Sequence, residues 1–147
     1  MITNYTNSFV VNKSTAEVFE CLTKKIPQWW STDFEGSSEK PNDEFMVRFD
    51  KTFKKFRIES TDENTIIWLC TDQYINIPEI KNKTEWIGTK VIWSILPQDF
   101  ATKVGILHEG LTPEAECFSV CEKGWNAFIA SLFALLEGGD GLPFIKS

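Results

Sequence analysis

Apolar and polar residues alternate with a period of two along much of the first 110 residues. In the stretch 44–50, Phe45, Val47 and Phe49 are separated by mostly polar neighbours, which places the rings on one face of a strand. The stretch 65–71 is instead almost continuously apolar and rich in β-formers, as in a central strand. The pattern predicts strands over residues 5–12, 44–50, 53–60, 65–71, 86–96 and 101–109.

The hydrophobic period changes from 2 to 3.6 after residue 112, which is typical of a helix with one buried face. Pro113 suits the first turn of a helix, and Gly138-Gly139 suits its end. We therefore predict a long helix from about Pro113 to Glu137. Its apolar stripe would consist of Phe118, Cys121, Trp125, Phe128, Leu132 and Leu135.

Two short helices are predicted between the first and second strands. Ser14-Thr15-Ala16-Glu17 fits a capping box, in which the Ser14 hydroxyl and the Glu17 carboxylate satisfy backbone N–H groups of the first turn. Pro27 then begins a second short turn that ends at Trp29-Trp30.

This order of elements predicts an α+β fold in a single domain over residues 1–147. A curved antiparallel sheet of about six to seven strands has one apolar face that needs a cover. Only the long C-terminal helix is large enough to supply it, so we expect the sheet to wrap around that helix.

Charge argues against nucleic acid as a partner. The net charge is −6 and the pI about 4.8, whereas nucleic-acid binding is driven by basic surfaces. The pairs Lys24-Lys25 and Lys54-Lys55 are flanked by acids, and we interpret them as solvated faces.

The chain shows no pattern of a membrane span or a secretory signal. No stretch approaches the roughly 18 apolar residues of a span, and residues 1–12 lack a basic start and a long apolar run. We therefore expect a cytoplasmic protein, a monomer or weak homodimer, whose four cysteines are reduced.

Several short segments resemble the helix-grip (START-like, SRPBCC) superfamily, and within it single-domain bacterial homologues of the activator of heat-shock protein 90 ATPase. They occur in the expected order over nearly the whole chain. The segments are Ala16-Glu17-Val18-Phe19, Trp29-Trp30, Ile67-Trp68, Thr84-Glu85-Trp86-Ile87-Gly88-Thr89, His108-Glu109-Gly110-Leu111, Glu116-Cys117, Cys121, Gly124-Trp125 and Ser131-Leu132.

The resemblance implies a fold that often encloses an apolar cavity between sheet and helix. It does not imply one activity, since the superfamily includes lipid carriers, cyclases, hormone receptors and co-chaperones.

His108, the only histidine, is predicted to face inward because it shares a strand face with Thr102, Val104 and Ile106. It could act as a general acid or base, or bind a polar head group. The alternative is a half-buried structural histidine, and no nucleophile or carboxylate is placed beside it by spacing.

Cys117 and Cys121 share a helix face, with Cβ atoms expected about 5–6 Å apart. A disulfide requires about 3.5–4.5 Å, so a bridge within a regular helix is not expected. A metal site would need further soft ligands, of which only His108 is a candidate, and we predict neither a metal nor a cofactor.

The 12 Phe and 6 Trp could either fill a core or line a pocket. We interpret the chain as a binding module for a small apolar or amphipathic ligand held between sheet and helix. The alternatives are a co-chaperone-like stimulator of heat-shock protein 90 ATPase and a cyclase- or hydratase-type enzyme using His108. Candidate ligand-binding residues are Trp30, Phe49, Trp68, Trp93, Ile106, His108, Phe118, Cys121, Trp125 and Phe128.

Overall fold

The computed structural model describes residues 3–146, in which seven strands and three helices follow one another; the longest connection, residues 75–89, joins β5 to β6. The elements are β1 (Tyr5–Val11), α1 (Thr15–Thr23), α2 (Ile26–Trp29), β2 (Phe34–Gly36), β3 (Glu44–Phe49), β4 (Thr52–Thr61), β5 (Thr65–Tyr74), β6 (Lys90–Gln98), β7 (Ala101–Glu109) and α3 (Phe118–Leu136).

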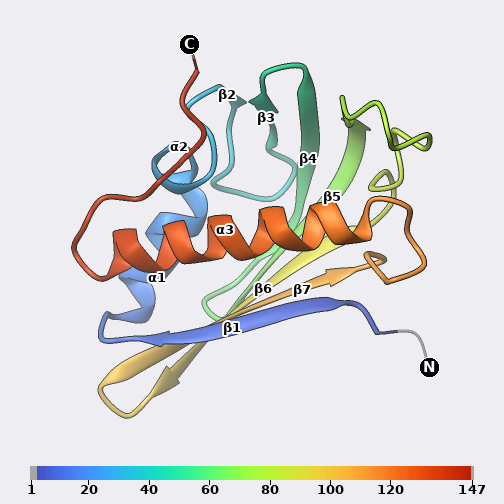
Figure 1. The fold of residues 1–147 in the computed structure, drawn as a ribbon. Coiled ribbons are helices and arrows are strands. Elements are labelled where there is room, and N and C mark those ends of the chain that lie inside the picture. The colour runs from blue at the N-terminus through green and yellow to red at the C-terminus, as the bar shows by residue number, and fades with distance from the viewer. Residues whose placement is uncertain (1–2, 147) are drawn as a thin grey trace.

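The strands form one antiparallel sheet in the order β1-β7-β6-β5-β4-β3-β2. The sheet curves, and α3 crosses its concave face (Figure 1). This confirms the predicted α+β class and the long C-terminal helix held by the sheet. The strand that the alternation did not reveal is β2, because three residues are too few to show a period.

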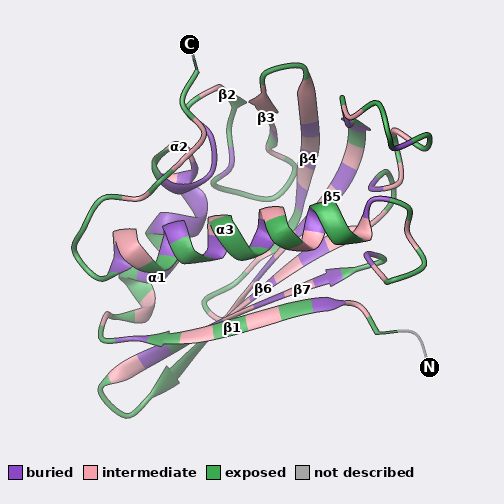
Figure 2. Ribbon diagram, viewed as in Figure 1, coloured by how far each residue is buried: buried purple, intermediate pink, exposed green. Residues whose placement is uncertain are grey.

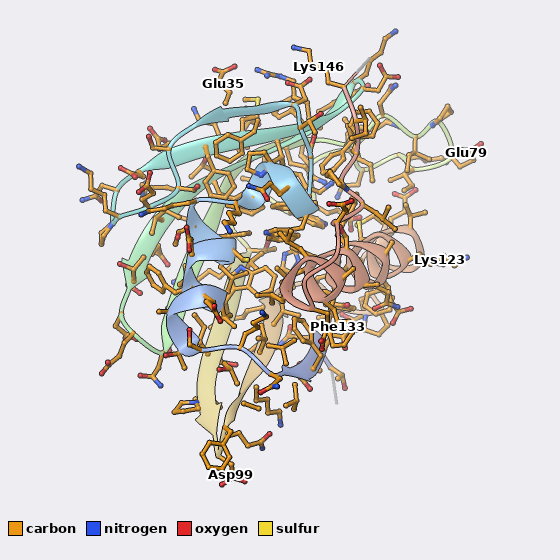
Figure 3. The ribbon with its side chains drawn as sticks, turned by 90° about the vertical axis from the view of Figure 1, so that its left-hand side faces the viewer. Glu35, Glu79, Asp99, Lys123, Phe133 and Lys146 are labelled. Carbon is orange, nitrogen blue, oxygen red and sulfur yellow. The ribbon has the colours of Figure 1, made fainter. Side chains whose placement is uncertain are left out.

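The core lies between the sheet and the three helices. Buried and exposed positions alternate along the strands, and the buried stripe of α3 faces inward (Figure 2). Figure 3 shows side chains filling the space between α3 and the sheet, with Lys123 pointing outward and Phe133 lying toward β1. The Phe133 ring packs edge-on against Phe9 of β1, with ring centres 5.4 Å apart. α3 is therefore anchored on its β1 side.

The start of α3 differs from the prediction. Residues 113–117 form turns and the helix begins at Phe118, so Pro113 as its start is wrong. The cap comes from a loop distant in sequence: the Glu85 carboxylate accepts hydrogen bonds from the backbone N–H groups of Glu116 (2.9 Å) and Cys117 (3.0 Å). In return the Glu116 carboxylate accepts from the backbone N–H groups of Lys81 and Asn82. These four bonds tie the loop 81–89 to the beginning of α3.

Replacing Glu85 by glutamine should lower the free energy of unfolding by about 1 kcal/mol, because an anionic cap at a helix start is lost. Chemical denaturation measures the change. Glu79→Gln is the matched control, since Glu79 is exposed in the preceding loop (Figure 3). Equal losses in both variants would contradict the assigned cap.

The predicted strand over residues 86–96 also begins later, at Lys90. Gly88 has a φ of +88°, which turns the backbone out of the extended conformation. Ile87 would lie on the apolar face of a strand with this alternation, but it is 45% exposed, whereas Trp86 is buried. The chain thus places Trp86 beside α3 from a turn rather than from a strand.

The predicted signals for the start of α1 and for the end of α3 are both confirmed. Ser14 and Glu17 form the capping box of α1. At the end of α3, Gly138 with a φ of +94° donates to the Leu135 carbonyl and Gly139 donates to the Ala134 carbonyl, as in a Schellman motif. Within residues 3–146, no helix has the length and apolar character needed to cross a bilayer.

Candidate functional site

A cavity of about 240 Å³ lies under the first half of α3, on the side away from β1. The backbone of α3 lies close to α1, α2 and β1. Toward β3 and β4, contact is made by side chains. Large rings form most of the walls. The lining residues are Trp30, Phe49, Thr52, Lys54, Ile75, Ile77, Trp86, Val120, Cys121, Gly124, Trp125 and Phe128.

The cavity opens to the surface. Val120 on its helix side is 43% exposed, and Thr52 and Ile77 on the sheet side are partly exposed. Trp30 and Trp125 at its inner end are almost fully buried. A ligand could therefore enter between α3 and the segment after β5 without unfolding any element.

Gly124 lines the cavity from the middle of α3. Glycine in a helix interior costs roughly 0.5–1 kcal/mol relative to alanine. No heavy atom lies within 4 Å of the position that a Cβ would take here, so close packing does not require this glycine. Its effect is to leave open space where a side chain would project into the cavity.

Lys54 contradicts its interpretation as part of a solvated basic face. Only 9% of it is exposed, because β4 turns it to the inner face together with Phe56 and Ile58. Its Nζ lies 4.4 Å from the ring centre of Trp86 and 5.2 Å from that of Phe49. Burial lowers the pKa of the ammonium below its ordinary value. The cavity wall is thus largely apolar, and Lys54 is its one basic group.

The ten candidate ligand-binding residues fall into two groups. Trp30, Phe49, Cys121, Trp125 and Phe128 line the cavity. The others do not: Phe118 is half-buried at the start of α3, and the remainder belong to the packed core, namely Trp68, Trp93, Ile106 and His108.

The inner end of the cavity is closed by stacked tryptophans. Trp30 stacks on Trp125 with ring centres 5.1 Å apart and on Trp68 at 5.7 Å. Trp93 packs edge-on against Trp68 at 5.4 Å. The side chains of α3 and of the sheet are therefore in contact beneath the middle of the sheet. The cavity lies where they separate, beside β3 and β4.

His108 is fully buried and both ring nitrogens have partners. Nδ1 accepts from the Trp125 indole N–H at 3.0 Å, and Nε2 lies 2.8 Å from Thr89 Oγ1. Thr89 Oγ1 donates to the Trp86 carbonyl, so it accepts from Nε2–H and fixes a neutral tautomer. Burial, and then the Lys54 charge, lower the His108 pKa to about 3. His108 thus positions Trp125 and the loop carrying Trp86 rather than facing the cavity.

The Cys117 thiol at the N-cap of α3 and the Cys121 thiol in its first turn are in contact. Both thiols are free. Their hydrogen bond raises the pKa of Cys117 and lowers that of Cys121, and the Lys54 charge lowers the Cys121 pKa further. Of the two thiols, Cys121 is the one that lines the cavity.

Among residues 3–146, no three His, Cys, Asp or Glu side chains gather as a metal site would require. The site residues that the sequence did not single out as candidates are Lys54, Ile75, Ile77, Trp86 and Gly124. For Lys54 a signal existed, since its spacing of two and four residues from Phe56 and Ile58 places all three on one strand face.

Comparison with known proteins gives likeness in structure alone. No protein-family model and no curated protein matches the chain. The solution structure of the Aha1 dimer from Colwellia psychrerythraea has a TM-score of 0.76 at 22% identity, covering 95% of this chain and 99% of that one. Protein SSP2350 from Staphylococcus saprophyticus has a TM-score of 0.71 at 14% identity, covering 97% and 98%.

DynU16, from the dynemicin biosynthetic locus, has a TM-score of 0.68 at 15% identity over 96% of this chain and 50% of that one. At such identities these similarities establish a shared fold. The chain has the helix-grip fold, as the sequence resemblance implied.

Proposed function

We propose that the protein is a binding module for a small apolar or amphipathic molecule held under α3. The observation that carries the proposal is the open cavity lined by rings and aliphatic side chains, with Gly124 leaving space in the helix above it. Water in a cavity with such a lining finds few hydrogen-bond partners. An apolar molecule therefore binds there more favourably than water does.

The size of the cavity limits the ligand. At about 240 Å³ it exceeds the roughly 150 Å³ of an engineered apolar cavity that binds benzene. One or two rings or a short alkyl chain would fit. Burying about six methylenes contributes about 5 kcal/mol, equivalent to a dissociation constant of order 10⁻⁴ M.

Titration with 1-octanol tests the proposal, with tryptophan fluorescence as the readout because Trp30, Trp86 and Trp125 all line the cavity. We expect saturable quenching or enhancement with one site per chain. Native mass spectrometry of the purified protein should retain any co-purified small molecule. A linear, unsaturable response to octanol together with a ligand-free mass spectrum would refute the proposal.

The geometry argues against the cyclase- or hydratase-type alternative based on His108. A general acid or base must reach the substrate directly or through one water. His108 is 0% exposed, both its nitrogens are occupied, and it is not among the cavity-lining residues.

The co-chaperone alternative rests on the likeness in fold to the Aha1 dimer. That likeness also favours testing for a weak homodimer. Measuring the ATPase rate of a purified bacterial homologue of heat-shock protein 90 with and without this chain would decide it. An unchanged rate at a several-fold molar excess would dispose of the alternative and leave the binding module unaffected.

A further inference from the structure

Lys54 is a buried amine that forms no ion pair with a carboxylate among residues 3–146. None of the ion pairs and side-chain hydrogen bonds formed among residues 3–146 includes its Nζ. An ammonium removed from water without a counter-charge is costly. The faces of Trp86 and Phe49 offset part of this cost through cation–π contacts. They leave the N–H groups of the ammonium without an acceptor from residues 3–146, facing the cavity.

A second buried donor lies opposite Lys54. Gln73 is its register partner on β5 and is 2% exposed. The Gln73 Oε1 accepts from the Trp86 backbone N–H at 2.9 Å, which fixes the orientation of the amide. The Gln73 Nε2 has no hydrogen-bond partner among the described residues. Side chains opposite each other on one face of an antiparallel pair have Cβ atoms about 4.5–5.5 Å apart. Gln73 thus leaves a second N–H donor without an acceptor beside Lys54, behind the cavity lining rather than in it.

Of the three thiols that act on the Lys54 charge, Cys70 and Cys117 do not supply an anion. Cys70, Cys117 and Cys121 are the titratable side chains that act on its charge, and all are buried. Burial raises the pKa of Cys70 to about 12, and the pKa of Cys117 is raised as well, so both remain neutral thiols near neutral pH. A neutral sulfur is a weak acceptor for an ammonium.

We propose that the cavity selects small amphipathic molecules carrying one carboxylate, which pairs with Lys54 while the apolar body lies against Trp86, Trp125 and Phe128. This rests on the proposed function and deepens it, because it names the class of ligand. Charge-assisted hydrogen bonds of this type are about twice as strong as neutral ones.

The single charge favours a carboxylate over a phosphate. A phosphate near neutral pH carries between one and two negative charges and three acceptor oxygens. Lys54 supplies one positive charge, and the rest of the lining is apolar apart from Thr52 and the cysteine thiol. A buried phosphate would keep uncompensated charge, whereas a monocarboxylate leaves the pair neutral.

Octanoate and 1-octanol form a matched pair of probes, alike in length and different in charge. At pH 7 we expect octanoate to bind about ten- to hundred-fold more tightly than octanol, the factor that a charge-assisted hydrogen bond supplies. In Lys54→Met, which keeps an unbranched side chain without the charge, octanoate should lose that advantage while octanol binding is retained. Octyl phosphate should bind no better than octanol.

Lys55→Met is the control, because Lys55 is the next residue and points to the opposite face of β4. It removes the same charge from the protein and should leave both affinities unchanged. Circular dichroism and thermal unfolding establish that the variants are folded.

The outcomes separate the two proposals. Failure of both octanoate and octanol to bind would refute the binding module itself. Equal binding of the two probes to the unmodified protein would leave the module intact and overturn the carboxylate proposal. A preference for octanoate that persists in Lys54→Met, or that disappears equally in Lys55→Met, would also overturn it.

Discussion

Lowering the pH from 6.5 to 4.5 is expected to reduce the free energy of unfolding by about 2–3 kcal/mol through His108 alone. In the folded chain the His108 pKa is lowered to about 3 by burial and by the Lys54 charge, against an ordinary value of 6.5. Between these values the unfolded state binds a proton that the folded state does not bind. Stability therefore falls as the pH falls through this window, at about 1.4 kcal/mol per pH unit.

Urea denaturation at half-unit pH steps measures this slope. Above pH 4.5 few carboxylates titrate, and those with lowered pKa values, such as Glu17 and Glu116, weaken the fold only at more acidic pH. His108→Gln is the matched variant, because it cannot become charged and keeps a donor near Thr89. Its stability should be nearly independent of pH between 6.5 and 5, and parallel curves for the two proteins would contradict the prediction.

A spectroscopic measurement does not depend on whether that variant folds. His108 is the only histidine, so its ¹⁵N-labelled ring gives one set of signals. They should show the Nε2–H tautomer and no titration between pH 8 and pH 5, given the bonds to Thr89 and Trp125. A midpoint near 6.5 would show that the ring is exposed and would reopen its candidacy as an acid or base.

The parts of this molecule that the sequence could reveal are those set by local period. Alternation correctly placed Phe45 and His108 on the inner face of their strands, because a strand face is determined by position alone. The end of α3 was predictable for a related reason, since Gly138-Gly139 carries the conformational signal locally.

Interactions between distant segments were not predictable in this way. The start of α3 depends on Glu85, which is 31 residues from Glu116 in sequence. The burial of Lys54 was missed because residue type outweighed position: a lysine beside another lysine suggests a solvated surface, although the period of β4 points it inward. The cavity depends on the position of α3, which lies close to β1 rather than to β4. No pattern in a single sequence encodes where a helix lies across a sheet.

Gly124→Leu is expected to weaken binding of octanol and octanoate while making the protein more stable. A Cβ at this position meets no atom within 4 Å, and the longer side chain would extend into the space that a ligand occupies. Leucine is favoured over glycine in a helix by about 0.8–1 kcal/mol, and filling an apolar void adds to this gain. Affinity should fall at least about tenfold, since the loss of roughly two buried methylene contacts, about 1.6 kcal/mol, already exceeds that factor.

Ala127→Leu is the control on the same helix, because Ala127 is exposed and does not line the cavity. It should change neither probe affinity nor stability by more than a few tenths of a kcal/mol. Opposite changes in binding and stability for Gly124→Leu are expected only if the space under α3 exists to hold a ligand. If Gly124→Leu instead binds octanol as the unmodified protein does, the ligand site lies elsewhere; if it is destabilised, the space is already filled by the surrounding side chains.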